Sequence, residues 1–270
     1  MITLVLLAAS LSGGAALQFA SPPVHAQLRL VAERAAAVPG RPATLGLEFR
    51  MDPGWHIYWR NPGDSGQPPV VAWRLPDGVR AGEFEWPVPE RIEVSGLVNY
   101  GYTGEVLLPV TVEVPASAKP GSTLALAAEV KYLICHDVCM AGKATVDLAL
   151  PVAAAAGGPS AEAPLFDAAR ARLPVPAPAS VSARATFEGR EFTVSIQTGR
   201  REAVGVFFPI EESRIDDSAP QVVTPLADGI RFRLRASSQL TAAPDQLTAV
   251  VALDGNRSYT IRAPVVRRAP

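Results

Sequence analysis

The chain has 270 residues, of which 48% are apolar and 19% are charged, and its net charge is -1. This length corresponds to one large domain or two medium ones, with enough apolar residues to bury their cores. The near-zero net charge provides no basic face, which argues against nucleic acid as a partner. Frequent Pro (26) and Gly (21), with few helical apolar patterns, favour turn-rich β structure.

Residues 1–26 predict a secretory signal peptide. An apolar run is followed by small residues and by Val24-His25-Ala26, an A-x-A-like cleavage site before Gln27. The run has no preceding Lys or Arg, which is atypical for such a signal. The alternative is a membrane anchor, but Ser12-Gly13-Gly14 interrupts the run before the roughly 20 residues that a membrane-spanning helix needs. We therefore expect an exported protein, in a compartment where disulfides persist.

Residues 27–150 predict a first β domain, because apolar and polar residues alternate along several runs. The clearest runs are Leu45–Met51, Ala128–Ile134 and Val146–Leu150. Turn sequences rich in Pro and Gly separate the runs, as at Asn61–Gly66. Strands of this kind are typical of an antiparallel sandwich. We expect the strand over Leu45–Met51 to bury one of its faces.

Residues 151–180 predict an Ala/Pro-rich linker that contains a short helix over Pro164–Leu173, with proline in its first turn. Residues 181–266 predict a second β domain, because Asp-Gly turns such as Asp228-Gly229 separate its alternating runs. This domain has neither Cys nor His, and we expect it to be a spacer or docking domain. The sequence thus predicts an all-β chain of two antiparallel sandwich domains.

The two cysteines, Cys135 and Cys139, are four residues apart. In an extended strand they would lie about 13 Å apart, whereas a disulfide requires Cα atoms within about 7 Å. The chain must therefore turn between them if they bond, as a three-residue hairpin loop or as one helical turn. So small a ring stabilises a fold little, and tight, exposed disulfides tend to be reducible. The pattern favours a redox couple over a structural staple.

A metal clip is the third alternative for the cysteine pair. The candidate donors are soft and favour Cu(I): Cys135, His136, Cys139 and Met140. A zinc site is not indicated, since a second ligand pair at proper spacing is missing. For thiol chemistry, Lys131 and His136 supply positive charge that lowers a thiol pKa, while Asp137 opposes it. We take these three as candidate tuning residues.

His56 is the remaining histidine of the predicted mature chain. It stands in the aromatic run Trp55–Trp59. A lone histidine in such a run is typically a packed, hydrogen-bonded residue, and we predict that role for it here.

Six motifs in a fixed order resemble the periplasmic N-terminal region of the DsbD/ScsB thiol:disulfide interchange proteins, the ScsB-like branch in particular. They are Gly54–Trp59, Asn61–Gly66, Trp86-Pro87, Tyr100–Tyr102, Glu105–Pro109 and Tyr132–Cys139. The resemblance is close over residues 28–150 and loose over residues 181–266. It implies immunoglobulin-like domains and a periplasmic location.

The resemblance further implies a function in electron transfer. Cys135 and Cys139 would be the redox pair of a protein-disulfide reductase component, with no cofactor besides their disulfide. A membrane-embedded protein or domain would donate electrons, and periplasmic thioredoxin-like or disulfide-isomerase proteins would accept them. ScsB-like proteins are also associated with copper tolerance. The alternative implied function is therefore a structural or Cu(I)-binding sandwich, with Cys135, Cys139 and Met140 as ligands.

Three features differ from the family pattern. The Cys-x3-Cys spacing is tighter than in the DsbD branch. Val98–Tyr102 matches the loop that caps the active site there, but Asn99 stands where an aromatic cap is expected, so Tyr100 or Tyr102 would shield the sulfurs. The family's membrane domain and C-terminal thioredoxin-like domain are not in this sequence. We therefore expect either a fragment or a module that a separate membrane protein supplies with electrons.

Overall fold

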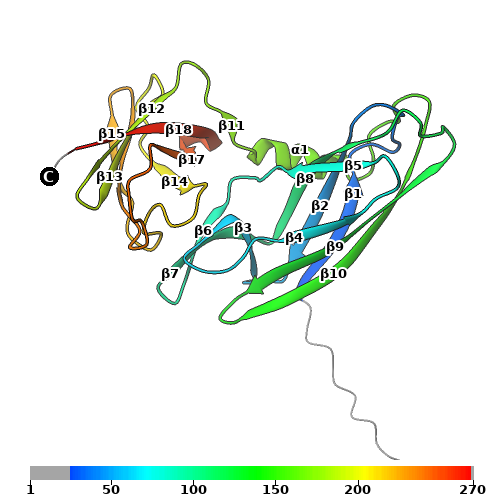
Figure 1. The fold of residues 1–270 in the computed structure, drawn as a ribbon, viewed down its shortest axis with the longest axis horizontal. Helices are drawn as coiled ribbons and strands as arrows, with labels where there is room; N and C mark the ends of the chain where they lie inside the picture. The colour runs from blue at the N-terminus through cyan, green and yellow to red at the C-terminus, as the bar shows by residue number, and fades with distance from the viewer. Residues whose placement is uncertain (1–24, 269–270) are drawn as a thin grey trace, which may run out of the picture.

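A computed structural model describes residues 25–268 of the chain and contains two β domains joined through a short helix (Figure 1). The predicted signal peptide lies almost entirely outside the described residues. Both regions predicted as β domains consist of strands, and the described residues contain one α-helix, so the predicted all-β class is confirmed. None of the helices among residues 25–268 is long and apolar enough to cross a membrane.

The first domain is a sandwich of two sheets. One sheet has the order β1-β2-β8-β5 and comprises β1 (Ala26–Ala32), β2 (Ala43–Met51), β8 (Glu105–Glu113) and β5 (Arg80–Phe84). The other has the order β10-β9-β3-β7-β6, with β4 also paired to β9. It comprises β3 (His56–Gly63), β4 (Val70–Arg74), β6 (Glu90–Val94), β7 (Leu97–Thr103), β9 (Thr123–Cys135) and β10 (Cys139–Pro151). The paired strands of this domain are antiparallel.

The predicted alternation builds the core between these sheets. Leu45 and Phe49 on β2 meet residues such as Ile57 on β3 and Val130 on β9, and all four are fully buried. Apolar residues at every second position of both sheets thus close one shared core.

Strand β2 differs from its prediction, because both of its faces are buried. Glu48 on the second face is 1% exposed. Arg29 and Arg50 donate to its carboxylate at 2.7 and 2.6 Å, which offsets the cost of burying that charge. Alternation alone could not predict that the second face of β2 is buried, because a polar residue on a strand normally marks the solvent face.

Helix α1 (Ala163–Arg172) lies where the sequence predicts it, with Pro164 in its first turn. Its Phe166 is fully buried and packs with Ala169 against Val31 and Leu107, on the outer face of the β1-β2-β8-β5 sheet. The helix is therefore docked on the first domain, and the predicted linker is ordered over this stretch.

The second domain contains the strands β11 (Val175–Pro176), β12 (Ser182–Glu188), β13 (Glu191–Gln197), β14 (Gly205–Pro209), β15 (Val222–Leu226), β16 (Gly229–Arg235), β17 (Gln246–Leu253) and β18 (Arg257–Arg267). Their order is β14-β17-β18-β12-β13-β16-β15, with β11 on β18. The predicted turn at Asp228-Gly229 joins β15 to β16. Strand β18 pairs in parallel with both β11 and β12, which local hairpin signals do not predict.

The two domains share an aromatic contact. Phe208 on β14 is 2% exposed and belongs to the first domain's core, where its ring meets Trp59 and Tyr100 edge-on at 6.2 and 5.2 Å. Asn61 donates from its amide to the Pro209 carbonyl at 2.8 Å. The Tyr100 hydroxyl donates to Asp217 of the second domain at 2.8 Å. Strands β3 and β7 of the first domain therefore pack against the second domain.

The carboxyl of Asp217 makes this contact pH-dependent. Burial raises its pKa to about 6, against the hydrogen bond from Tyr100, and Asp64 and Asp216 add to the rise. A raised acid pKa stabilises the folded state below the unfolded value of 3.8, and this stabilisation is lost as the pH rises through about 6. We expect the loss to amount to about 3 kcal/mol.

Urea unfolding between pH 4 and 7.5 measures this effect. Asp217→Asn keeps an oxygen acceptor for the Tyr100 hydroxyl but removes the charge, so the variant should lack this part of the decline. Parallel stability curves for both proteins would contradict the assignment to Asp217.

Candidate redox site

Strands β9 and β10 form a long hairpin (Figure 1). The two cysteines are bonded to each other at its tip. Cys135 ends β9, Cys139 begins β10, and the two residues are directly opposite in the ladder with Cα atoms 4.1 Å apart. The turn between them is closed by the His136 amide, which donates to the Val138 carbonyl at 3.1 Å. Of the two turns that the spacing allows, the structure has the three-residue hairpin loop.

The two sulfur-bearing residues differ in access to solvent. Cys135 is 2% exposed, whereas Cys139 is exposed and follows Val138, an apolar residue that is 64% exposed at the turn. A thiolate arriving from another protein can therefore reach Cys139 without opening the fold, while Cys135 is shielded. The pair has one sulfur placed for contact with a partner and one placed behind it.

Tyr58 on β3 contacts both sulfurs from the buried side. Its hydroxyl donates to Cys135 Sγ at 2.9 Å and lies 3.5 Å from Cys139 Sγ. The side chain is fully buried, and Gly66, at φ +100°, lies so close that a Cβ there would sit 2.1 Å from the ring. Burial raises the pKa of the Tyr58 phenol, against a smaller effect of Ser65. The group therefore stays protonated and can donate to a sulfur.

Tyr58 is not among the site residues predicted from the sequence. Its neighbours Ile57 and Trp59 belong to the sandwich core, so alternation places Tyr58 on the other face of the sheet. The sequence hides this alternation, because both faces of β3 are buried and its first residues are aromatic or apolar on either face. No local signal connects a residue on β3 to a cysteine 77 positions later.

His56 shares this outer face. It lies directly opposite Cys135 in the β3–β9 pairing, and its ring lies 5.3 Å from that of Tyr58. The residue is packed as predicted, at 1% exposure, but its Nε2 has no hydrogen-bond partner, so the predicted hydrogen-bonded role does not extend to this nitrogen. Burial, followed by the charge on His136, lowers the pKa of the His56 imidazole, which favours its neutral form.

A hollow of about 310 Å³ lies beside the hairpin turn. It is lined by the hairpin turn, the end of β6, the start of β3 and the turn before β3, namely by Gly54, His56, Ile92–Ser95, His136 and Asp137. His136 holds Asp137 through Nδ1 at 2.8 Å and is tilted against Trp55 at 5.8 Å. Gly54, at φ +83°, provides room for the His136 ring, because a Cβ there would approach it to 2.7 Å. The hairpin turn is thus packed, through His136, against Gly54 and Trp55 on one side.

The residues predicted to cap the sulfurs lie on β7 and are buried. Asn99 accepts a hydrogen bond from Ser65 at 2.9 Å. The hydroxyl of Tyr100 is bonded to Asp217, and that of Tyr102 donates to the Pro87 carbonyl at 2.7 Å. The phenol that contacts the disulfide is that of Tyr58, and the gating role of the β7 residues stays a prediction.

Two further predicted residues lie apart from the sulfurs. Lys131 is four residues back along β9, about 13 Å from Cys135. Met140 follows Cys139 on the strand, so it points to the opposite face, where it packs against the core. Within residues 25–268, no three or more His, Cys, Asp or Glu side chains are grouped so as to hold a metal ion.

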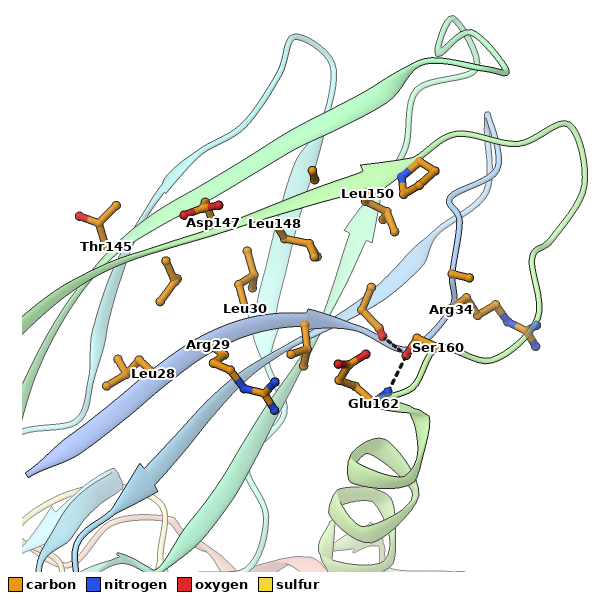
Figure 2. A pocket seen from close by; sticks show the side chains of 16 residues that line it. Leu28, Arg29, Leu30, Arg34, Thr145, Asp147, Leu148, Leu150, Ser160 and Glu162 are labelled. Atoms are coloured by element: carbon orange, nitrogen blue, oxygen red, sulfur yellow. Dashed lines mark hydrogen bonds between the residues drawn. The ribbon is translucent and has the colours of Figure 1, made fainter.

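A second hollow lies away from the disulfide. It measures about 420 Å³ and runs between β1 and β10, the facing edges of the two sheets, with Leu28, Leu30, Leu148 and Leu150 among its lining residues (Figure 2). The Ser160 hydroxyl donates to the Ala32 carbonyl at one end of this hollow. On β10 the residues that line this hollow begin at Thr145, six residues along the strand from Cys139, so the hollow is separate from the disulfide.

A sandwich that presents a disulfide at an exposed hairpin tip, backed by a buried phenol, defines a thiol–disulfide exchange domain. Residues 27–151 match the family described as "Thiol:disulfide interchange protein DsbD, N-terminal", and this part of the chain is a domain of that family. No curated protein matches the chain in sequence.

One solved structure extends the likeness in fold to both domains. The N-terminal periplasmic domain of ScsB from Proteus mirabilis matches with a TM-score of 0.69 at 21% identity, over 92% of this chain and 96% of that one. This match shows a shared fold. A protein of unknown function from Porphyromonas gingivalis W83 aligns over 89% of this chain and all of its own, at 12% identity and a TM-score of 0.24, which is too low to carry an argument.

Proposed function

We propose that the chain is an exported thiol–disulfide exchange module whose Cys135–Cys139 pair passes electrons to disulfide-bearing proteins of the periplasm. One observation carries the proposal: the bond joins two residues that the hairpin already holds opposite each other, and one of them is exposed. Such a bond closes a minimal loop and stabilises the fold little. The family of residues 27–151 and the periplasmic location of the ScsB domain support the same function.

The pair is loaded by two exchange steps. A thiolate of a membrane-embedded donor attacks Cys139 Sγ, the Cys135–Cys139 bond breaks, and Cys135 leaves with the electron pair. The Tyr58 hydroxyl, 2.9 Å from this sulfur, donates a hydrogen bond to the departing thiolate. A second donor thiol then attacks the mixed disulfide and releases Cys139, which leaves the donor oxidised and the pair reduced.

Delivery runs through the same exposed sulfur. The Cys139 thiolate attacks a disulfide of a thioredoxin-like or disulfide-isomerase partner and forms a mixed disulfide. Cys135 then attacks Cys139 Sγ, which re-forms the bond seen here and releases the partner as a dithiol. Cys139 is assigned the partner-facing role because it is the exposed member of the pair.

The reduction potential of the Cys135–Cys139 couple tests the proposal. The purified chain is equilibrated in glutathione buffers of graded potential, and its free thiols are counted by alkylation and mass spectrometry. An exchange protein should give a value between about -270 and -120 mV. A value well below about -300 mV would identify an inert staple and overturn the proposal.

A further inference from the structure

The imidazole of His56 is buried without the hydrogen bond that would normally accompany it. The side chain is 1% exposed, and its Nε2 is among the few buried side-chain atoms of the described residues that lack a partner. Native proteins satisfy most buried polar groups, and an exception calls for an explanation. Neither the core nor the exchange steps above use this nitrogen, although it belongs to the site.

The position of His56 indicates what the nitrogen is for. His56 and Cys135 are directly opposite in an antiparallel pair, so their Cβ atoms lie about 5 Å apart on the same face of the sheet. In the oxidised form the Cys135 sulfur is held by its bond to Cys139 and by the Tyr58 hydroxyl. Reduction frees this side chain to rotate, and the imidazole of His56 is the basic side chain directly opposite it in the ladder.

We propose that His56 is the proton acceptor for Cys135 when the pair closes on a bound partner. This inference rests on the proposed function and concerns its last step. In the mixed disulfide between Cys139 and the partner, Cys135 is a thiol. Its proton passes to His56 Nε2 as its sulfur bonds to Cys139 Sγ. The bond from Cys139 to the partner breaks, and the partner leaves with the electron pair as a thiolate. The proton on His56 is then released to solvent or to that thiolate.

The other ionisable groups around His56 fit this step less well. Tyr58, on the same strand, is a hydrogen-bond donor to the sulfur, and its raised pKa keeps its proton in place. His136, in the turn, is bound to Asp137, which lines the hollow with it. Glu93 lines the same hollow from the end of β6, and on β7 the ladder neighbour of His56 is the uncharged Thr103.

The electrostatic setting of His56 is consistent with an acceptor. Its lowered pKa keeps the ring neutral at neutral pH, and a neutral ring that carries its proton on Nδ1 offers a free lone pair at Nε2. An unassisted thiol has a pKa of about 8.5, so only a small fraction is thiolate at pH 7. A positioned base therefore accelerates closure, and general bases typically contribute about 10²–10⁴-fold.

The test follows closure on the chain alone. The reduced protein is mixed with oxidised glutathione and quenched with acid at intervals, and mass spectrometry separates the glutathione adduct on Cys139 from the closed disulfide. His56→Gln should leave adduct formation unchanged and slow closure about tenfold or more at pH 7. Thr103→Val alters the opposite neighbour of His56 and should change closure by less than about twofold. Equal closure rates in His56→Gln and wild type would overturn the proposal.

A pH profile of the wild-type chain tests the proposal without any variant. Closure assisted by His56 should level off above the lowered pKa of the imidazole. Closure without a base should keep rising with pH towards about 8.5, the thiol value, and this result in the wild type would equally overturn the proposal. Since glutathione is the only reactant, both measurements are independent of the reduction potential that decides the proposed function.

Discussion

Cys135→Ser should trap a stable mixed disulfide with glutathione rapidly, whereas Cys139→Ser should react about a hundredfold more slowly. In the first variant the remaining thiol is exposed, and no second cysteine is left to resolve the adduct. In the second variant the remaining thiol belongs to Cys135, at 2% exposure, behind the hairpin turn. An attack there requires local opening, and an opening free energy of about 3 kcal/mol reduces the rate about a hundredfold.

Both variants should also lose turnover altogether. Exchange needs one sulfur to engage the partner and another to release it, so removal of either stops the cycle after at most one event. The assay is reduction of insulin as a model disulfide substrate with dithiothreitol as the donor, against the uncatalysed rate. Equal trapping by both variants would contradict the assignment of Cys139 as the partner-facing cysteine, and retained turnover in either would contradict the exchange mechanism.

The sequence predicts the parts of this site that depend on short-range signals. The separation of Cys135 and Cys139 limits the chain to a turn between them, and alternation along Ala128–Ile134 predicts the strand that leads into it. The order of the motifs upstream then predicts a redox pair. The first two inferences use residues within one element or one turn of each other, and the third rests on the family resemblance that the whole set of motifs carries.

Such short-range signals could not predict the contacts between strands that are far apart in the sequence. Tyr58 and His56 reach Cys135 only because β3 pairs with β9, a pairing of residues 79 positions apart at His56. Asn99, Tyr100 and Tyr102 follow from the family pattern as a cap, but alternation along the strand and the second domain's Asp217 place their polar groups elsewhere. The second domain, predicted as a spacer or docking domain, contributes Phe208 to the first domain's core, and this contact too joins residues far apart in the sequence.

Phe208→Ala should destabilise the chain by about 3–5 kcal/mol and separate the unfolding of the two domains. A buried phenylalanine that is cut back to alanine loses its transfer free energy and leaves a cavity, which accounts for this size. Here the ring also joins two domains, because it lies against Trp59 and Tyr100 of the first while its strand belongs to the second. Its removal takes away the aromatic contact between the domains and leaves smaller apolar contacts, such as that of Val250, with the hydrogen bonds of Asn61 and Asp217.

The neighbouring residue provides a matched control. Phe207 is equally buried, but its ring faces Phe232 within the second domain's own core, at 5.9 Å. Phe207→Ala removes the same atoms from the same strand and should lower the stability of the second domain without loosening the contact. Calorimetry should therefore show two resolved transitions for Phe208→Ala. A single transition shifted equally in both variants would contradict a role for Phe208 in coupling the domains.

The consequence for the redox site follows from the strand that Phe208 supports. Trp59 is the residue after Tyr58, so a ring that packs on Trp59 holds the backbone which aims the Tyr58 hydroxyl at the Cys135 sulfur. In Phe208→Ala, Cys135 should become more reactive once the disulfide is reduced, whereas exposed Cys139 should react as before. Alkylation rates of the two thiols, read by peptide mass spectrometry, should thus change at Cys135 alone. An unchanged alkylation rate of Cys135 would show that β3 keeps its position when the Phe208 ring is removed.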